Sequence, residues 1–137
     1  MENEVFDYEL MIKEFHLDTF GHVNNATYLQ IYEEARWELI TINNYGIDKI
    51  KSTGLGPIVM EINIKYLKEL KARDKIKIST QLIDYSTKVG SLKQWITNQN
   101  GEICSKMEMK FGLFDTKNRK LVAATDEWLK AIGGNNK

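Results

Sequence analysis

The chain has 137 residues, of which 42% are hydrophobic and 28% charged, proportions that are typical of a globular protein. A chain of this length can bury a self-sufficient core without disulfides or metals, so we expect residues 1–137 to form one domain. Its 19 basic residues balance 19 acidic ones, for a net charge of +0, which disfavours both nucleic acid and an anionic membrane as partners.

The N-terminal part of the chain is predicted to form a strand, a loop and a long helix. Apolar and polar residues alternate from Tyr8 to about Phe15, which is the period of a half-buried strand. Residues 16–25 break this pattern, and we expect Asn25 to cap the helix that follows. In that helix apolar residues recur every three or four positions, and Gly46 is expected to end it after about twenty residues, or roughly 30 Å.

The remainder of the chain predicts antiparallel strands joined by short turns. A connection rich in glycine precedes them, at residues 54–57. Alternating apolar and polar residues then predict strands at 60–66, 75–82, 88–98, 102–115 and 120–124. The sequence Asn-Gln-Asn-Gly at 98–101 predicts a tight hairpin. Thr125 is expected to cap a short final helix over residues 126–132.

This order of elements decides the fold class. Strands that are joined by tight turns cannot be parallel neighbours, so a doubly wound parallel sheet is excluded. The economical arrangement is α+β, an antiparallel sheet with its helices on one face. Because the long helix is broadly apolar and about as long as the strands, we expect the sheet to curl around it.

Candidate catalytic residues gather in the loop before the long helix. The sequence contains no phosphate-binding glycine-rich loop and no G-x-S-x-G or H-E-x-x-H motif. The loop instead carries five polar residues, His16, Asp18, His22, Asn24 and Asn25. A helix N-terminus presents unpaired amides and positive potential, so Asp18 can face the substrate carbonyl that this end binds. Asp18 is therefore either a catalytic carboxylate or a turn residue, and His22 is either an acid–base group or an orienting residue.

Two histidines six residues apart are weak evidence for a metal site, and we expect neither a metal nor a cofactor. The single cysteine, Cys104, excludes an intrachain disulfide framework. It lies in a predicted strand, where a small buried hydrophobe is more plausible than a nucleophile. The acidic residues 1–4 and the lack of a long apolar run predict neither a signal peptide nor a membrane anchor, so a cytoplasmic location is expected.

The charged residues outside the loop each allow two interpretations of their role. Glu33 in the helix is either solvated and paired with a neighbour such as Arg36, or covered by the curled sheet, where it needs a polar partner. A basic stretch follows the strand at 60–66. It is either a solvated face or a local patch for a phosphorylated cofactor, and it consists of Lys65, Lys68, Lys71, Arg73 and Lys75.

A family resemblance rests on the loop and the first half of the helix. The sequence there reads Asp18-Thr-Phe-Gly-His-Val-Asn-Asn-Ala-Thr-Tyr28, followed by Tyr32-Glu-Glu-Ala-Arg36. The pattern D-x-x-G-H-V-N-N-x-x-Y followed by E-x-A-R resembles that of the hot-dog-fold thioesterases of the hydroxybenzoyl-CoA thioesterase type. This resemblance implies a long central helix wrapped by a five- or six-stranded antiparallel sheet. It also implies a homodimer with a continuous sheet, or a tetramer, with active sites at the subunit interface.

The resemblance also assigns roles to residues. Asp18 matches the catalytic carboxylate, as nucleophile or general base, and the backbone amide of Asn25 matches the group that polarises the thioester carbonyl. His22 matches a histidine of plant acyl-ACP thioesterases. The resemblance implies substrate contacts for Gly21, Val23, Asn24, Tyr28, Glu33, Ile58 and Val59.

The function predicted from the sequence is hydrolysis of a fatty or aromatic acyl-CoA thioester. One alternative is an acyl-ACP thioesterase, because the Val-Asn-Asn sequence at 23–25 also resembles the plant enzymes and the basic stretch could meet an acidic carrier protein. The other alternative is an acyl-binding module without activity. Asp18 argues against that module, since a carboxylate beside a thioester contributes nothing to binding alone.

Overall fold

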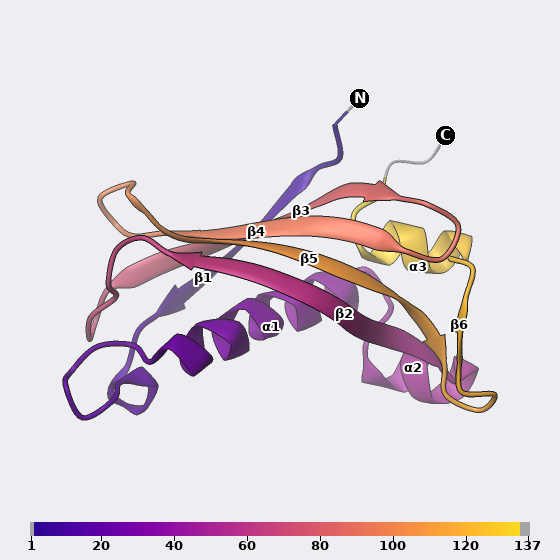
Figure 1. Cartoon of the computed structure of the whole chain (residues 1–137), viewed down its shortest axis with the longest axis horizontal. Coiled ribbons are helices and arrows are strands. Elements are labelled where there is room, and N and C mark those ends of the chain that lie inside the picture. Colours follow the sequence, from indigo (N-terminus) through magenta and orange to yellow (C-terminus); the bar gives the residue numbers. More distant parts are fainter. Residues whose placement is uncertain (1, 135–137) are drawn as a thin grey trace.

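The computed structural model describes residues 2–134, in which an antiparallel sheet arches over one long helix (Figure 1). The strand order is β1-β3-β4-β5-β2, and β6 pairs with the end of β5. The strands are β1 Val5–Met11, β2 Leu55–Tyr66, β3 Lys75–Tyr85, β4 Gly90–Thr97, β5 Ile103–Asp115 and β6 Lys120–Val122. The α-helices are α1 Asn25–Ile42, α2 Ile47–Thr53 and α3 Asp126–Ala131. The predicted α+β class, with a six-stranded sheet wrapped around a helix, is confirmed.

Several predicted boundaries at the N-terminal side are wrong. The first strand ends at Met11, because Glu14–His16 forms a short 3₁₀ helix in which the His16 Nδ1 accepts a hydrogen bond from the Lys13 N–H at 2.9 Å. The helix cap is Asn24, whose side chain accepts from the Ala26 N–H at 2.8 Å. Helix α1 ends at Ile42 after 18 residues. The segment that follows it contains a second helix, α2, which the sequence analysis missed.

Strand β2 starts five residues earlier than predicted. Gly56 and Pro57 lie inside it and not in the connection before it. A proline cannot donate a ladder hydrogen bond, but it is tolerated in an edge strand. β2 is such a strand, because in the described part of the chain it pairs with β5 alone.

The concave face of the sheet and one side of α1 form the core. The buried side chains of α1 are Tyr28, Ile31, Tyr32, Ala35, Leu39 and Ile40. Each large aliphatic side chain buried in this way stabilises the fold by roughly 1.5–3 kcal/mol. Among the residues described, 2–134, no helix is long and apolar enough to cross a membrane.

A chain of buried polar groups fixes α1 on the sheet. The Tyr32 hydroxyl and the Ser105 hydroxyl are 2.8 Å apart, and Ser105 donates onward to the Lys65 carbonyl. The Gln94 side chain donates to the Tyr32 carbonyl at 3.1 Å and accepts from the Arg36 guanidinium at 2.9 Å. Since buried polar groups are costly unless paired, these bonds define one position of the helix along the sheet.

The free edge of β2 exposes apolar side chains. Its pairing with β5 leaves the other side of the strand without a neighbouring strand among residues 2–134. Unpaired strand edges with apolar residues favour pairing with another chain. The exposed apolar residues on and just beyond this edge are Val59, Met60, Ile62, Tyr66 and Leu67.

Candidate active site

The loop that carries Asp18 is a tight turn. A short antiparallel bridge joins Leu17 to Val23. Inside it the Asp18 N–H donates to the His22 carbonyl at 2.9 Å, and the Gly21 N–H donates to the Asp18 carbonyl at 3.1 Å. Gly21 has a φ of +82°, which glycine adopts without the strain that a Cβ would cause. The turn therefore brings Asp18 and His22 opposite each other.

The Asp18 carboxylate is held in a fixed orientation. Its Oδ1 accepts hydrogen bonds from the Phe20 N–H at 2.9 Å and the His22 N–H at 3.3 Å. Within residues 2–134, Oδ2 has no hydrogen-bond partner. One oxygen of the half-buried carboxylate thus stabilises the turn, and the other is available to accept a hydrogen bond from a ligand.

The first turn of α1 presents an unpaired amide next to this loop. Asn24 caps the helix, so the Ala26 N–H is satisfied. The Asn25 carbonyl accepts a hydrogen bond from the Tyr66 hydroxyl at 3.1 Å, which ties the helix start to β2. The Asn25 N–H donates no hydrogen bond to any residue among those described. It points from the positive end of an 18-residue helix and can bind an oxyanion.

His22 is paired with a residue that the sequence analysis missed. Its Nε2 lies 3.2 Å from the Glu69 Oε2, and both side chains are about half exposed. A short bridge between His22 and Lys71 brings the two segments together. No local sequence signal links positions so far apart, so only the fold reveals Glu69 as the group that orients the imidazole.

Two of the predicted substrate-contacting residues form the wall behind this loop. Val23 is buried, and its N–H donates to the Leu70 carbonyl at 3.2 Å. Tyr28 is buried and packs edge-to-face against Tyr66, with ring centroids 5.0 Å apart. Burial raises the pKa of Tyr28 to about 12, so its hydroxyl stays neutral at physiological pH.

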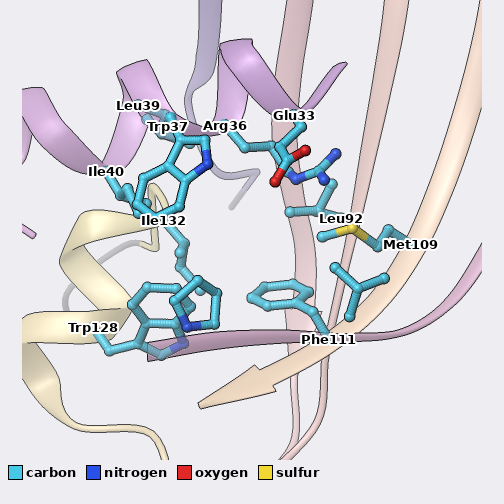
Figure 2. Close-up of a pocket in the computed structure, with 12 residues that line it drawn as sticks. Glu33, Arg36, Trp37, Leu39, Ile40, Leu92, Met109, Phe111, Trp128 and Ile132 are labelled. Carbon is cyan, nitrogen blue, oxygen red and sulfur yellow. The ribbon is translucent and has the colours of Figure 1, made fainter. Parts of the chain in front are cut away.

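A second feature is a pocket between α1 and the sheet (Figure 2). It has a volume of about 150 Å³, and it is lined by Glu33 and Val59 together with mostly apolar side chains from α1, β4, β5 and α3. Val59 pairs with Phe111 in the ladder, whereas Ile58 pairs with Gly112. Successive strand residues point to opposite faces, so Ile58 lies on the other face of β2. The predicted contact residues are thus divided between the loop and this pocket, except Ile58, which lies in neither.

Arg36 brings a charge to the edge of the same pocket. It is half-buried, its Nη1 donates to Gln94, and burial lowers its pKa while the nearby Glu33 opposes that shift. Of the two alternatives for Glu33, its exposed position fits the solvated one, and its role in contacting substrate stays a prediction.

The basic stretch is partly neutralised within the chain. Lys68 Nζ lies 2.6 Å from Glu102 Oε2, and Arg73 Nη2 lies 2.7 Å from Glu14 Oε1. Within residues 2–134, no group of three or more histidine, cysteine or acidic side chains is placed to hold a metal ion.

Cys104 is a structural residue by its surroundings. It is 0% exposed, and burial raises the pKa of its thiol, whereas a nucleophilic cysteine needs a lowered pKa.

We expect Cys104→Ser to keep thioesterase turnover within about threefold of the parent, because the substitution leaves the size of this buried side chain nearly unchanged. Turnover of the purified variant and its thermal unfolding check this, and loss of turnover with unchanged unfolding would revive a thiol mechanism.

The comparison with known families decides the class. A family model described as the Thioesterase-like superfamily matches residues 14–132. The chain belongs to this superfamily. It is a thioester hydrolase of the hot-dog fold, as the resemblance at the Asp18 loop predicted.

Individual relatives agree with the family. The chain is 32% identical over 120 residues to the long-chain acyl-CoA thioesterase FadM of Escherichia coli. This match covers 87% of this chain and 90% of that protein. The crystal structure of the probable thioesterase YbaW from Escherichia coli is 29% identical, with a TM-score of 0.80, over 93% of this chain and 96% of that one. The protein SAV2348 of Staphylococcus aureus, solved in complex with CoA, shares the fold at 17% identity, with a TM-score of 0.88 over 100% of this chain and 90% of that one.

Proposed function

We propose that the protein hydrolyses acyl-CoA thioesters to the free acid and CoA, with Asp18 as the catalytic carboxylate. The observation that carries this proposal is the pairing of two groups in one short segment, a carboxylate oriented by two backbone amides and the unpaired Asn25 N–H at the start of α1. The similarity to an acyl-CoA thioesterase over most of both chains supports the choice of carrier.

The reaction uses these groups in two possible ways. In the first, an Asp18 oxygen attacks the thioester carbonyl carbon, the C–S bond breaks, and water then hydrolyses the resulting anhydride. In the second, Asp18 takes a proton from a water molecule, and that water attacks the carbonyl. In both, the Asn25 N–H stabilises the negative charge on the carbonyl oxygen. The departing thiolate is a good leaving group and needs little assistance from a general acid. His22, paired with Glu69, orients the Asp18 turn.

We propose that the working unit is a homodimer, with a tetramer as the further possibility, and that residues 1–137 act as one domain in it. The exposed apolar edge of β2 supports this assembly. Two β2 strands that pair across a two-fold axis would make one continuous sheet and cover both edges. The cytoplasmic location stays a prediction.

The alternative carrier is an acyl-ACP. An acidic carrier protein needs a positive surface, and the only concentrated basic segment already gives Lys68 and Arg73 to carboxylates of the chain itself. This internal pairing reduces the positive surface that an acidic carrier protein would meet, and the similarity to an acyl-CoA thioesterase over most of both chains supports CoA as the carrier. Membership in the thioesterase superfamily disfavours the inactive acyl-binding module.

Replacement of Lys68, Lys71 and Arg73 together by alanine tests the carrier. We expect a rise in KM for acyl-CoA with little change in kcat, because phosphate contacts contribute equally to substrate and transition-state binding. Steady-state kinetics with matched acyl-CoA and acyl-ACP substrates measure this. If KM rises only for acyl-ACP, the carrier is a protein, and if neither KM changes, the basic stretch is a solvated face.

A further inference from the structure

The Asn25 N–H, which is the proposed contact of the thioester carbonyl, belongs to a polarised peptide unit. The carbonyl of this unit is that of Asn24, and it accepts hydrogen bonds from the Thr27 N–H at 2.9 Å and the Tyr28 N–H at 3.3 Å. Hydrogen bonds to one end of a peptide unit strengthen the donor at its other end. The start of α1 therefore makes this N–H a better donor than an isolated amide.

The next peptide unit is held at both ends by side chains. Its N–H, that of Ala26, donates to the Asn24 side chain at 2.8 Å. Its carbonyl, that of Asn25, accepts from the Tyr66 hydroxyl at 3.1 Å. Because peptide units are planar and these two units share the Asn25 Cα, holding the second unit limits the directions in which the Asn25 N–H can point.

Tyr66 reaches the helix from a rigid support. It is the last residue of β2, and beyond it the Leu67 and Lys68 N–H groups both donate to the Cys104 carbonyl of β5, at 2.9 and 3.0 Å. The Tyr66 ring packs edge-to-face against the buried Tyr28 of α1. A group carried by a strand is placed more precisely than one carried by a loop, so the Tyr66 hydroxyl is a fixed tether for the helix start.

The first turn of α1 needs such a tether. The N–H groups at the start of a helix have no partners within the helix, and helix ends open most easily. The turn reads Asn-Ala-Thr-Tyr at 25–28, with no acidic side chain to stabilise it by charge. This composition keeps the positive end of the helix open to an anion, and it leaves the stabilisation of the turn to Asn24, Tyr28 and Tyr66.

We propose that Tyr66 is a positioning residue of the thioesterase reaction. Its hydroxyl holds the peptide unit that follows Asn25 and thereby aims the Asn25 N–H at the carbonyl oxygen of the substrate. Tyr66 acts through the backbone and not by contact with the substrate. The inference rests on the proposed function, in which this N–H stabilises the negative charge on that oxygen.

Tyr66→Phe tests this role, because it keeps the ring beside Tyr28 and removes only the hydroxyl. We expect kcat to fall about tenfold, which is less than the 10²–10³ that loss of a whole oxyanion-hole donor costs, because the N–H remains and only its direction is loosened. KM for the same acyl-CoA should stay within about twofold of the parent, since the lost effect acts on the transition state and not on substrate binding. Steady-state thiol release gives both constants.

The matched control is Tyr45→Phe. The Tyr45 hydroxyl also donates to a backbone carbonyl, that of Leu55, at 3.1 Å, and its ring also packs edge-to-face, against Trp128. Tyr45 follows the opposite end of α1 from Asn25, and it is 2% exposed, whereas Tyr66 is 47% exposed. The control should therefore lower the temperature of unfolding at least as much as Tyr66→Phe does, while its kcat stays within about twofold of the parent.

A second measurement follows the helix start without any substrate. Amide hydrogen exchange, observed by NMR, reports the Ala26 N–H that the Asn24 side chain protects. Tyr66→Phe should speed this exchange by about fivefold, the effect of losing one hydrogen bond of ordinary strength. Tyr45→Phe should leave it unchanged.

Parental kcat in folded Tyr66→Phe overturns the inference. A raised KM with unchanged kcat also overturns it, because the hydroxyl would then be a direct contact of the substrate. An equal loss of kcat in Tyr45→Phe overturns it as well, since the loss would reflect stability alone. Parental turnover in Asp18→Asn would instead mean that the proposed function itself has failed.

Discussion

Asp18→Asn is expected to lower kcat by about 10²–10⁴, the usual contribution of a positioned base or nucleophile, while the fold is retained. The asparagine side chain keeps an oxygen that can accept the hydrogen bonds from the Phe20 and His22 N–H groups. It loses the negative charge that either mechanism needs. Single-turnover and steady-state rates of thiol release measure the effect, and circular dichroism checks the fold.

A matched control separates loss of chemistry from loss of the turn. Asp115 also orders a turn with its carboxylate, which accepts from the Lys117 N–H at 2.9 Å and the Asn118 N–H at 3.1 Å. Asp115→Asn makes the same chemical change far from the loop and should leave kcat within about twofold of the parent, as is usual for surface changes away from a site. Nearly parental turnover in Asp18→Asn would remove Asp18 from the mechanism.

Ile62→Lys is expected to separate the dimer and to lower kcat/KM by about 10²-fold or more, the scale of loss when a substrate is no longer positioned. Ile62 is 37% exposed on the free edge of β2, and a lysine there opposes strand pairing between subunits. Sedimentation velocity gives the assembly state, and thiol release at low and high protein concentration gives the activity.

The control for this variant is Ile83→Lys. Ile83 is 44% exposed and lies on β3, at the bulge opposite β4 and separated from the edge strand β2 by β4 and β5. Ile83→Lys adds the same charge as Ile62→Lys at an exposed apolar position that does not face the proposed interface. The assembly state and the activity of this variant should therefore match those of the parent protein. An Ile62→Lys monomer that is fully active at nanomolar concentration would contradict the account of a shared site.

The parts of the fold that follow from local sequence were predictable. The three- and four-residue spacing of apolar residues identified α1, and the Asn-Gly turn identified the hairpin between β4 and β5. The predicted helix cap, Asn25, was one residue too late, because the chain has two adjacent asparagines and it is Asn24 whose side chain accepts from the Ala26 N–H. Helix α2 was missed because its seven residues are too few to show a period.

In the candidate site too, the residues that lie close together in the sequence were predictable and those brought together by the fold were not. The Asp18 turn and the start of α1 lie within one short segment, so a motif could point to both. Glu69, Phe111 and Trp128 reach their places through a bridge, a strand register and a helix that packs at the end of the chain. No spacing rule connects such residues, and the pocket that they help to form was therefore not predicted.

Thiol release from a panel of acyl-CoA and acyl-ACP thioesters, with the acyl group held constant between carriers, tests whether the protein is an acyl-CoA hydrolase. We predict catalytic turnover of acyl-CoA, with kcat/KM at least about tenfold above that for the matching acyl-ACP. Preference for the acyl-ACP, or binding of acyl-CoA without release of thiol by folded protein, would contradict this prediction.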